Sequence, residues 1–175
     1  PYTTLFRSKD MGEVHCFLEI EVIRTPEVIL INQRHYVLSM LFKFGMTEFK
    51  SFSTPLDKNV KLCRDSGKAV DPTRFRQIVG SLIYLTITQP DLSYPVGLIS
   101  QFMSQPKAEH LQCTQRILCY VSSTKDRALF YQARVAEQLV VYTDADLVRD
   151  VDDRRSTSGF AFSKGSAAIA WSSKK

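Results

Sequence analysis

Apolar and polar residues alternate near the start of the chain and then recur at helical spacing. The alternation over residues 14–22 predicts a half-buried strand, and the apolar residues 28–31 predict a returning strand after a turn at 25–27. Over residues 35–44 the apolar period lengthens to three or four positions, which predicts a helix that ends at Gly45. The buried face of this helix would carry Val37, Leu38, Leu41 and Phe44.

The middle of the chain predicts three helices. Asp71 followed by Pro72 predicts the start of the first, because Asp accepts hydrogen bonds from first-turn N–H groups and proline has none to lose. The second is expected over 91–103, or from Pro95 onward, since an interior proline costs about 3 kcal/mol. The third is expected over 107–122. Their inward faces would carry Phe75, Ile78, Val79, Leu82, Ile83, Leu92, Val96, Ile99, Met103, Leu111, Thr114, Ile117, Leu118 and Val121.

Short apolar runs return in the last third of the chain, and they predict strands. They cover residues 129–131, 139–144, 159–163 and 167–172, with turn-forming residues between them. The chain therefore divides into a strand pair with one helix, a helical middle and a β-rich unit. Together these predict an α+β fold.

Composition and charge narrow the class of protein. Of the 175 residues, 44% are apolar and 23% charged, as in a typical soluble domain. The chain lacks the run of about 18 apolar residues that a membrane span needs, so no membrane partner is expected. The net charge is +5, but residues 144–153 hold five Asp and one Arg, so the remainder carries +9. A basic body with one acidic cluster suits a polyanion-binding protein, although a solvated basic surface beside an acidic loop explains the same numbers.

Asp144 follows an apolar strand, a position from which a carboxylate can bind Mg²⁺ for phosphodiester chemistry. One such Asp supplies a single ligand, whereas two-metal hydrolysis needs several carboxylates from different elements. The nearby Asp150, Asp152 and Asp153 would more naturally be solvated or pair with neighbouring arginines. The four cysteines form no Cys-x-x-Cys pair, so neither a zinc site nor a disulfide framework is expected.

Six strings along residues 9–175 together resemble one known family, the Pol polyprotein of copia-type LTR retrotransposons, from the end of reverse transcriptase to the start of ribonuclease H. The strings are MGEVHCFLEIEV at 11–22, YVLSMLFKFGM at 36–46, STPLD at 53–57, RFRQIVGSLIYLTITQPDLSYPVGLISQFM at 74–103, YTDADLVRDVDDRRSTSGFAFSKG at 142–165 and IAWSSKK at 169–175. Residues 1–8, PYTTLFRS, stand apart, because they match the translation of a common sequencing-adapter end.

The resemblance implies the fold in more detail. It implies a β-hairpin plus a helical thumb/connection region, followed by the first three strands of a truncated ribonuclease H-like fold. The end of the reverse transcriptase palm and the start of the thumb would occupy residues 9–56. The helical thumb/connection region would occupy 57–131, and the truncated ribonuclease H domain 137–175.

The resemblance also implies a function for the parent polyprotein, which would copy RNA into DNA and cleave the RNA strand of RNA–DNA hybrids with Mg²⁺. Asp144 would be the first metal-binding carboxylate of ribonuclease H. Phe17, Leu18, Glu19 and Ile20 would match the hairpin that grips the primer terminus, and the helices would line the path of the template–primer duplex. The other partners would be the missing parts of the same polyprotein. The expected location is intracellular, in a cytoplasmic virus-like particle for the parent.

In this family the polymerase aspartates and the other nuclease carboxylates would lie outside the 175 residues. The sequence therefore predicts an inactive fragment that binds no Mg²⁺ stably; a residual, non-catalytic nucleic-acid-binding module is the alternative. Several positions depart from the family pattern and suggest a decaying copy. Glu19 and Val28 replace glycines, Pro95 replaces an alanine, and Gln89 and Cys119 replace arginines.

Overall fold

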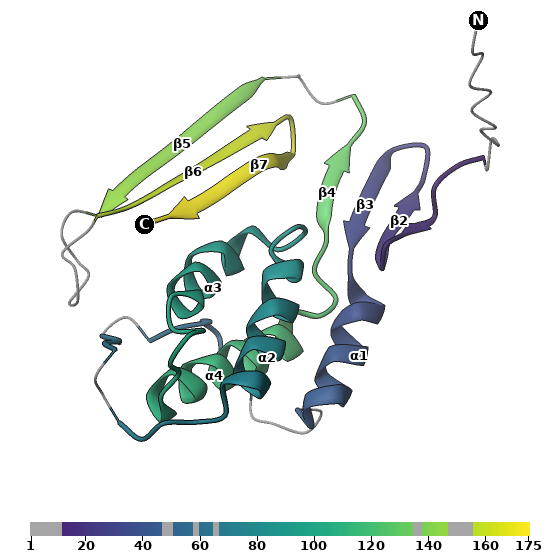
Figure 1. The fold of residues 1–175 in the computed structure, drawn as a ribbon. Helices are drawn as coiled ribbons and strands as arrows, with labels where there is room; N and C mark the ends of the chain where they lie inside the picture. The colour runs from purple at the N-terminus through teal and green to yellow at the C-terminus, as the bar shows by residue number, and fades with distance from the viewer. Residues whose placement is uncertain (1–11, 47–50, 58–59, 65–66, 135–137, 147–155) are drawn as a thin grey trace, which may run out of the picture.

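The computed structural model describes residues 12–46, 51–57, 60–64, 67–134, 138–146 and 156–175, and these form the expected α+β fold (Figure 1). The predictions for residues 1–8 and for the acidic residues 150–153 concern segments outside this described part. A four-stranded antiparallel sheet comprises β1 (Cys16–Phe17), β2 (Ile20–Arg24), β3 (Val28–Asn32) and β4 (Leu129–Gln132). A three-stranded antiparallel sheet comprises β5 (Leu139–Asp146), β6 (Thr157–Lys164) and β7 (Ala167–Lys174). The helices are α1 (Arg34–Phe44), α2 (Pro72–Leu85), the 3₁₀ helix η1 (Pro90–Leu92), α3 (Ser93–Ser100) and α4 (Ala108–Thr124).

The first sheet differs from the sequence prediction at its start. A single strand over residues 14–22 is wrong, because the chain reverses at Leu18 and Glu19 and pairs Phe17 with Ile20. The alternating pattern runs straight through this two-residue turn, so periodicity alone could not reveal it. The predicted turn at 25–27 and the returning strand are confirmed.

The fourth strand of this sheet comes from the far side of the helical region. β4 pairs with β3 in antiparallel register, with Leu30 opposite Phe130 and Ile29 opposite Tyr131. Sequence order placed residues 129–131 with the C-terminal strands, whereas the structure places them beside β3 (Figure 1). The N-terminal hairpin therefore has a partner strand within this chain.

Local signals set the ends of α1 and α2 as expected. Gly45 takes a left-handed conformation, with φ of 70°, and ends α1. The Asp71 carboxylate accepts hydrogen bonds from the backbone N–H groups of Thr73 and Arg74 at 2.9 and 3.4 Å, and thus caps α2. Two predicted inward residues, Leu38 and Ile83, are instead exposed, because each lies just past the edge of the buried stripe of its helix. Those stripes consist of Val37, Met40, Leu41 and Phe44 in α1, and Phe75, Ile78, Val79, Leu82 and Leu85 in α2.

The second predicted helix is shorter than expected and begins before its proline. α3 starts at Ser93, so Pro95 lies in the first turn, where backbone N–H groups have no partner within the helix. A start at Pro95 is therefore wrong, and so is a helix reaching residue 103. The chain tightens into a turn after Ser100 and buries Phe102 rather than Met103.

All four α-helices contribute to one hydrophobic core, and the fully buried His110 of α4 packs beside it. The His110 ring stacks on Phe102, with 3.8 Å between ring centroids. The three-stranded sheet packs against this helical body mainly through β7 and α3, and the Trp171 indole N–H donates to the Thr86 carbonyl at 2.8 Å. None of the described helices has the length and apolar character needed to cross a membrane.

Candidate functional site

The tip of the first hairpin displays large apolar side chains to solvent. Phe17 and Leu18 are 63% and 67% exposed. Leu18 and Glu19 have φ angles of 49° and 61°, as a type I′ hairpin turn requires at its two central positions. Glycine adopts this conformation freely, whereas Glu19 does not. Position 19, where the resemblance leads us to expect glycine, is therefore one at which the backbone disfavours Glu. Val28, at the other position where glycine is expected, lies in β3 and needs no positive φ.

Two contacts from the helices fix this hairpin in place. The Tyr84 hydroxyl of α2 donates a hydrogen bond to the Leu18 carbonyl at the tip. On β2, the Glu21 carboxylate accepts from the His35 backbone N–H at 2.9 Å and contacts the His35 Nδ1 at 2.9 Å. A carboxylate at this position also stabilises the positive end of the α1 dipole. The sequence held no signal for either contact, because the partners are far apart along the chain.

Asp144 lies on β5, exposed and in register with Gly159 of β6. It lines an open cavity of about 470 Å³ between the three-stranded sheet and the start of α3. Aromatic side chains of Tyr94, Tyr142 and Trp171 line the same cavity, as does a second acid, Asp91. The structure thus brings Asp144 to a cavity that it shares with a carboxylate from the helical region.

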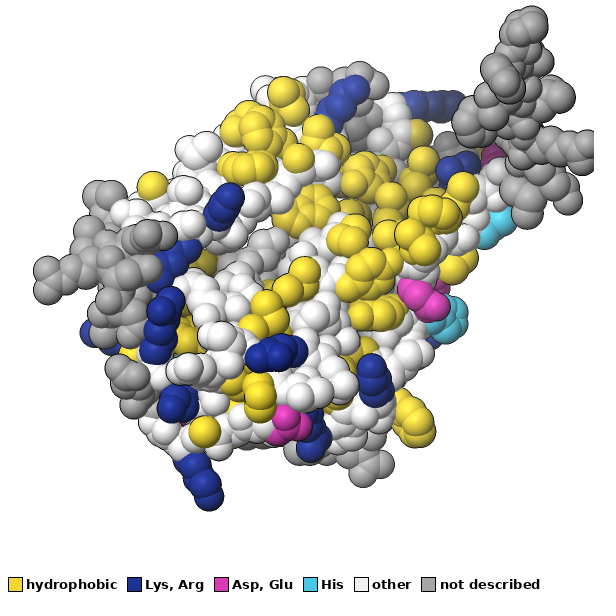
Figure 2. Space-filling model, in the orientation of Figure 1, with side chains coloured by type: hydrophobic (Ala, Val, Ile, Leu, Met, Phe, Trp, Pro, Cys, Tyr) yellow, Lys and Arg dark blue, Asp and Glu magenta, His cyan; other side chains and the backbone are white. Residues whose placement is uncertain are grey.

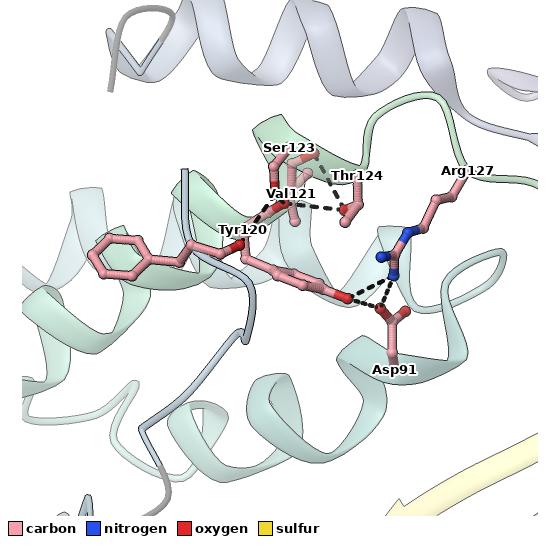
Figure 3. A network of polar contacts seen from close by, with 7 residues as sticks. Asp91, Tyr120, Val121, Ser123, Thr124 and Arg127 are labelled. Atoms are coloured by element: carbon pink, nitrogen blue, oxygen red, sulfur yellow. Dashed lines mark hydrogen bonds and ion pairs between the residues drawn. The ribbon is translucent and has the colours of Figure 1, made fainter. Parts of the chain in front are cut away.

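Asp91 is already engaged by two other side chains (Figure 3). The Tyr120 hydroxyl donates to its carboxylate, and the Arg127 guanidinium lies 3.5 Å from the same oxygen and 2.9 Å from the Tyr120 hydroxyl. Burial raises the pKa of Tyr120, and its hydrogen bond to Asp91 raises it further. Asp91 is therefore a structural anion that joins η1 to α4. Sequence reasoning gave this triad no role.

Whether this cavity can hold Mg²⁺, the ion implied for the parent enzyme, depends on how many acidic side chains converge there. Within the part of the chain that the structure describes, no three His, Cys, Asp or Glu side chains gather closely enough to hold a metal ion. Asp144 supplies one carboxylate, and the carboxylate of Asp91 is committed to Tyr120 and Arg127. These residues do not by themselves fit a Mg²⁺ site.

Basic side chains are prominent on the molecular surface. In Figure 2 lysines and arginines are spread over the visible face, with few acidic side chains among them. Some are paired, as Arg34 is with Asp126 at 2.7 Å. Others, including Lys61, Lys68 and Arg74, are exposed and have no acidic partner among the described residues. Such unpaired cations are available to phosphate groups.

Comparison with known proteins shows which proteins this chain is similar to. It is 44% identical over 171 residues to the retrovirus-related Pol polyprotein from transposon RE1 of Arabidopsis thaliana, covering 97% of this chain and 12% of that protein. It is 32% identical to the corresponding polyprotein from transposon TNT 1-94 of Nicotiana tabacum, covering 97% of this chain and 13% of that protein. The Arabidopsis mitochondrial protein AtMg00810, 35% identical, is covered over 72% of its length.

The chain spans only about an eighth of the polyproteins that it matches. No protein-family model matches it, and no solved structure matches it significantly. The identity nevertheless extends over nearly the whole chain and includes relatives from different plants. The chain therefore belongs to the copia-type retrotransposon Pol polyproteins, as a homologue of one segment of them.

Proposed function

We propose that this segment holds an RNA–DNA duplex within its parent polyprotein and catalyses no cleavage on its own. The Phe17–Ile20 hairpin would meet the primer end of the duplex, as in a reverse transcriptase, and the exposed basic side chains would bind the phosphate backbone. The three-stranded sheet with Asp144 would be the opening part of a ribonuclease H-like fold.

The observation that carries this proposal is the hairpin tip. Large apolar side chains that are exposed next to each other on a fixed turn indicate a contact site, whereas a single exposed apolar residue is common on protein surfaces. Phe17 and Leu18 are both more than 60% exposed, while their hairpin is held to α1 through the Glu21 side chain and to α2 through the Leu18 carbonyl. Apolar side chains suit the sugar and base surfaces at a duplex end, whereas cations suit its phosphates.

The proposal assigns no bond-breaking step to the described residues. Cleavage of a phosphodiester by metal ions needs several convergent carboxylates, and Asp144 alone supplies one. The antiparallel order β5-β6-β7, with an acid on the first strand, agrees with the start of a ribonuclease H-like sheet. Asp144 would act there only together with carboxylates from other parts of the polyprotein.

Binding to a labelled RNA–DNA hybrid with a recessed DNA 3′ end, measured by fluorescence anisotropy, tests the proposal. We expect affinity to fall steeply as salt rises, because phosphate contacts release counterions. Leu18→Ser should weaken binding, whereas Phe42→Ser, which alters an even more exposed apolar residue on α1, should not. Absence of binding at low salt, or equal losses in the two variants, would overturn it.

A further inference from the structure

The hairpin turn is held in a conformation that its own residues disfavour. Among the described residues other than glycine, positive φ angles occur at Leu18, Glu19 and Arg134, and the first two are consecutive. Both of these side chains are exposed, so packing of the side chains does not hold the turn. A backbone outlier of this kind persists only where surrounding structure imposes it.

The imposing contact is the hydrogen bond from Tyr84 to the Leu18 carbonyl. This carbonyl belongs to the central peptide of the turn. Flipping that peptide would convert a type I′ turn into type II′, in which only the first central residue keeps a positive φ. The flip would relieve Glu19, but it would turn the carbonyl away from Tyr84. The hydrogen bond therefore selects the type I′ form.

Tyr84 is itself well placed to impose this choice. Its ring packs edge-on against Tyr36, with 5.0 Å between centroids and 75° between planes. The Tyr36 hydroxyl points elsewhere and donates to the Ser81 carbonyl of α2 at 3.3 Å, so the ring contact with Tyr84 does not depend on it. The conformation of the turn is thus set by a contact with the helices rather than by the two strands that it joins.

We infer that Tyr84 is a positioning residue for the hairpin tip, which keeps the Leu18–Glu19 turn in its type I′ form and so directs Phe17 and Leu18 toward the end of a bound duplex. This inference rests on the proposed function for the ligand, but the turn conformation can be measured without any ligand. It adds a residue of α2 to a site that the sequence assigned to the hairpin alone.

The test uses the full chain and four substitutions, singly and in combination, with the recessed hybrid as probe. Tyr84→Phe keeps the ring and removes the hydroxyl, and it should weaken binding about three- to tenfold, the usual effect of one hydrogen bond. Tyr36→Phe is the matched control, because it removes the other hydroxyl of the ring pair without touching Leu18. It should bind within about twofold of the wild type.

Rescue separates the turn conformation from general destabilisation. Glycine tolerates positive φ, so Glu19→Gly should restore the binding of Tyr84→Phe to the level of the Glu19→Gly variant alone. Glu19→Gln removes the same charge but keeps the backbone preference, and added to Tyr84→Phe it should leave the loss in place. Rescue by both substitutions would mean that charge is responsible, and would overturn the inference.

The NOE between the amide protons of Leu18 and Glu19 reports the orientation of the central peptide in the free protein, because these protons lie close together in a type I′ turn and far apart in a type II′ turn. It should weaken in Tyr84→Phe and keep its wild-type intensity in Tyr36→Phe. An unchanged NOE in Tyr84→Phe would overturn the inference whatever the binding data show. Failure of the wild-type chain to bind the hybrid would overturn the proposed function and the part of the inference that names the duplex, whereas the NOE tests separately whether Tyr84 sets the turn.

Discussion

Leu30 of β3 lies directly opposite Phe130 of β4, and on its other side lies opposite Ile23 of β2. This row of apolar side chains crosses three strands and joins the hairpin to a strand that follows the whole helical region. Cross-strand apolar pairs are the main source of stability on a sheet face. The hairpin is thus held in the fold by contacts with both the helices and β4.

Leu30→Ala should lower the free energy of unfolding by about 1–2 kcal/mol, because it removes half-buried apolar surface shared by two strands. Urea unfolding followed by circular dichroism measures the change. Phe42→Ala removes a side chain that is 80% exposed and should change stability by less than about 0.5 kcal/mol. Equal effects in both variants would argue against β3–β4 pairing in solution.

Asp71→Ala should destabilise the protein by about 1 kcal/mol, because two N–H groups of the first turn of α2 lose their acceptor. The same unfolding experiment measures it. Glu27→Ala, at an exposed turn position, is the control for loss of a surface carboxylate. A stabilised Asp71→Ala variant would show that the cap is not formed.

Tyr120→Phe should cost about 1–2 kcal/mol at neutral pH, because the Asp91 carboxylate loses a hydrogen-bond donor. The substitution should also change the alkaline limb of the stability curve. The pKa of Tyr120 is raised in the folded protein. The stabilisation that its protonated hydroxyl contributes is therefore complete below the ordinary tyrosine pKa near 10, and it disappears as the pH rises through the raised pKa of the folded state. Tyr120→Phe should therefore lose less stability above pH 10 than the wild type does.

Burial raises the pKa of Tyr131 as well, so part of the alkaline loss should remain in Tyr120→Phe. Unfolding midpoints between pH 8 and pH 12 give the comparison. Tyr142→Phe, which alters a tyrosine that is 65% exposed, should leave the curve unchanged. An identical alkaline loss in wild type and Tyr120→Phe would contradict the contact of the buried Tyr120 with Asp91 and Arg127.

Asp144→Asn should leave stability within about 0.5 kcal/mol of the wild type, because the carboxylate is exposed. Affinity for the hybrid should change less than about twofold, since one charge is removed from a predominantly basic surface. The wild-type chain should show no Mg²⁺-dependent cleavage of the RNA strand in a gel assay. Cleavage that Asp144→Asn abolishes would contradict the proposal that this segment holds the duplex without cutting it.

The sequence predicted those structural features correctly that neighbouring residues determine. The cap at Asp71, the left-handed stop at Gly45 and the four C-terminal strand runs are confirmed, because capping and periodicity are properties of neighbouring residues. It missed the reversal at Leu18 and Glu19, since the turn lacks the glycine that marks most such turns. Only the family resemblance indicated a hairpin there.

Contacts between residues far apart along the chain could not be predicted from the sequence. The pairing of β3 with β4 and the triad of Asp91, Tyr120 and Arg127 join residues whose separation carries no periodic signal. The Tyr84 contact at the hairpin tip belongs to the same class. The candidate site residues Phe17, Leu18, Glu19, Ile20 and Asp144 remain predictions, because their assignment comes from resemblance and awaits a bound duplex.

Photocrosslinking from position 17 tests the central claim most directly. A benzoylphenylalanine replacing Phe17 should crosslink to the last few nucleotides at the recessed 3′ end of the DNA strand. The same group at position 42, on α1, should give no such product. Crosslinks confined to the primer end would establish the hairpin as the part that meets it, whereas crosslinks spread evenly along the duplex, or none at a concentration where the hybrid is bound, would contradict the account.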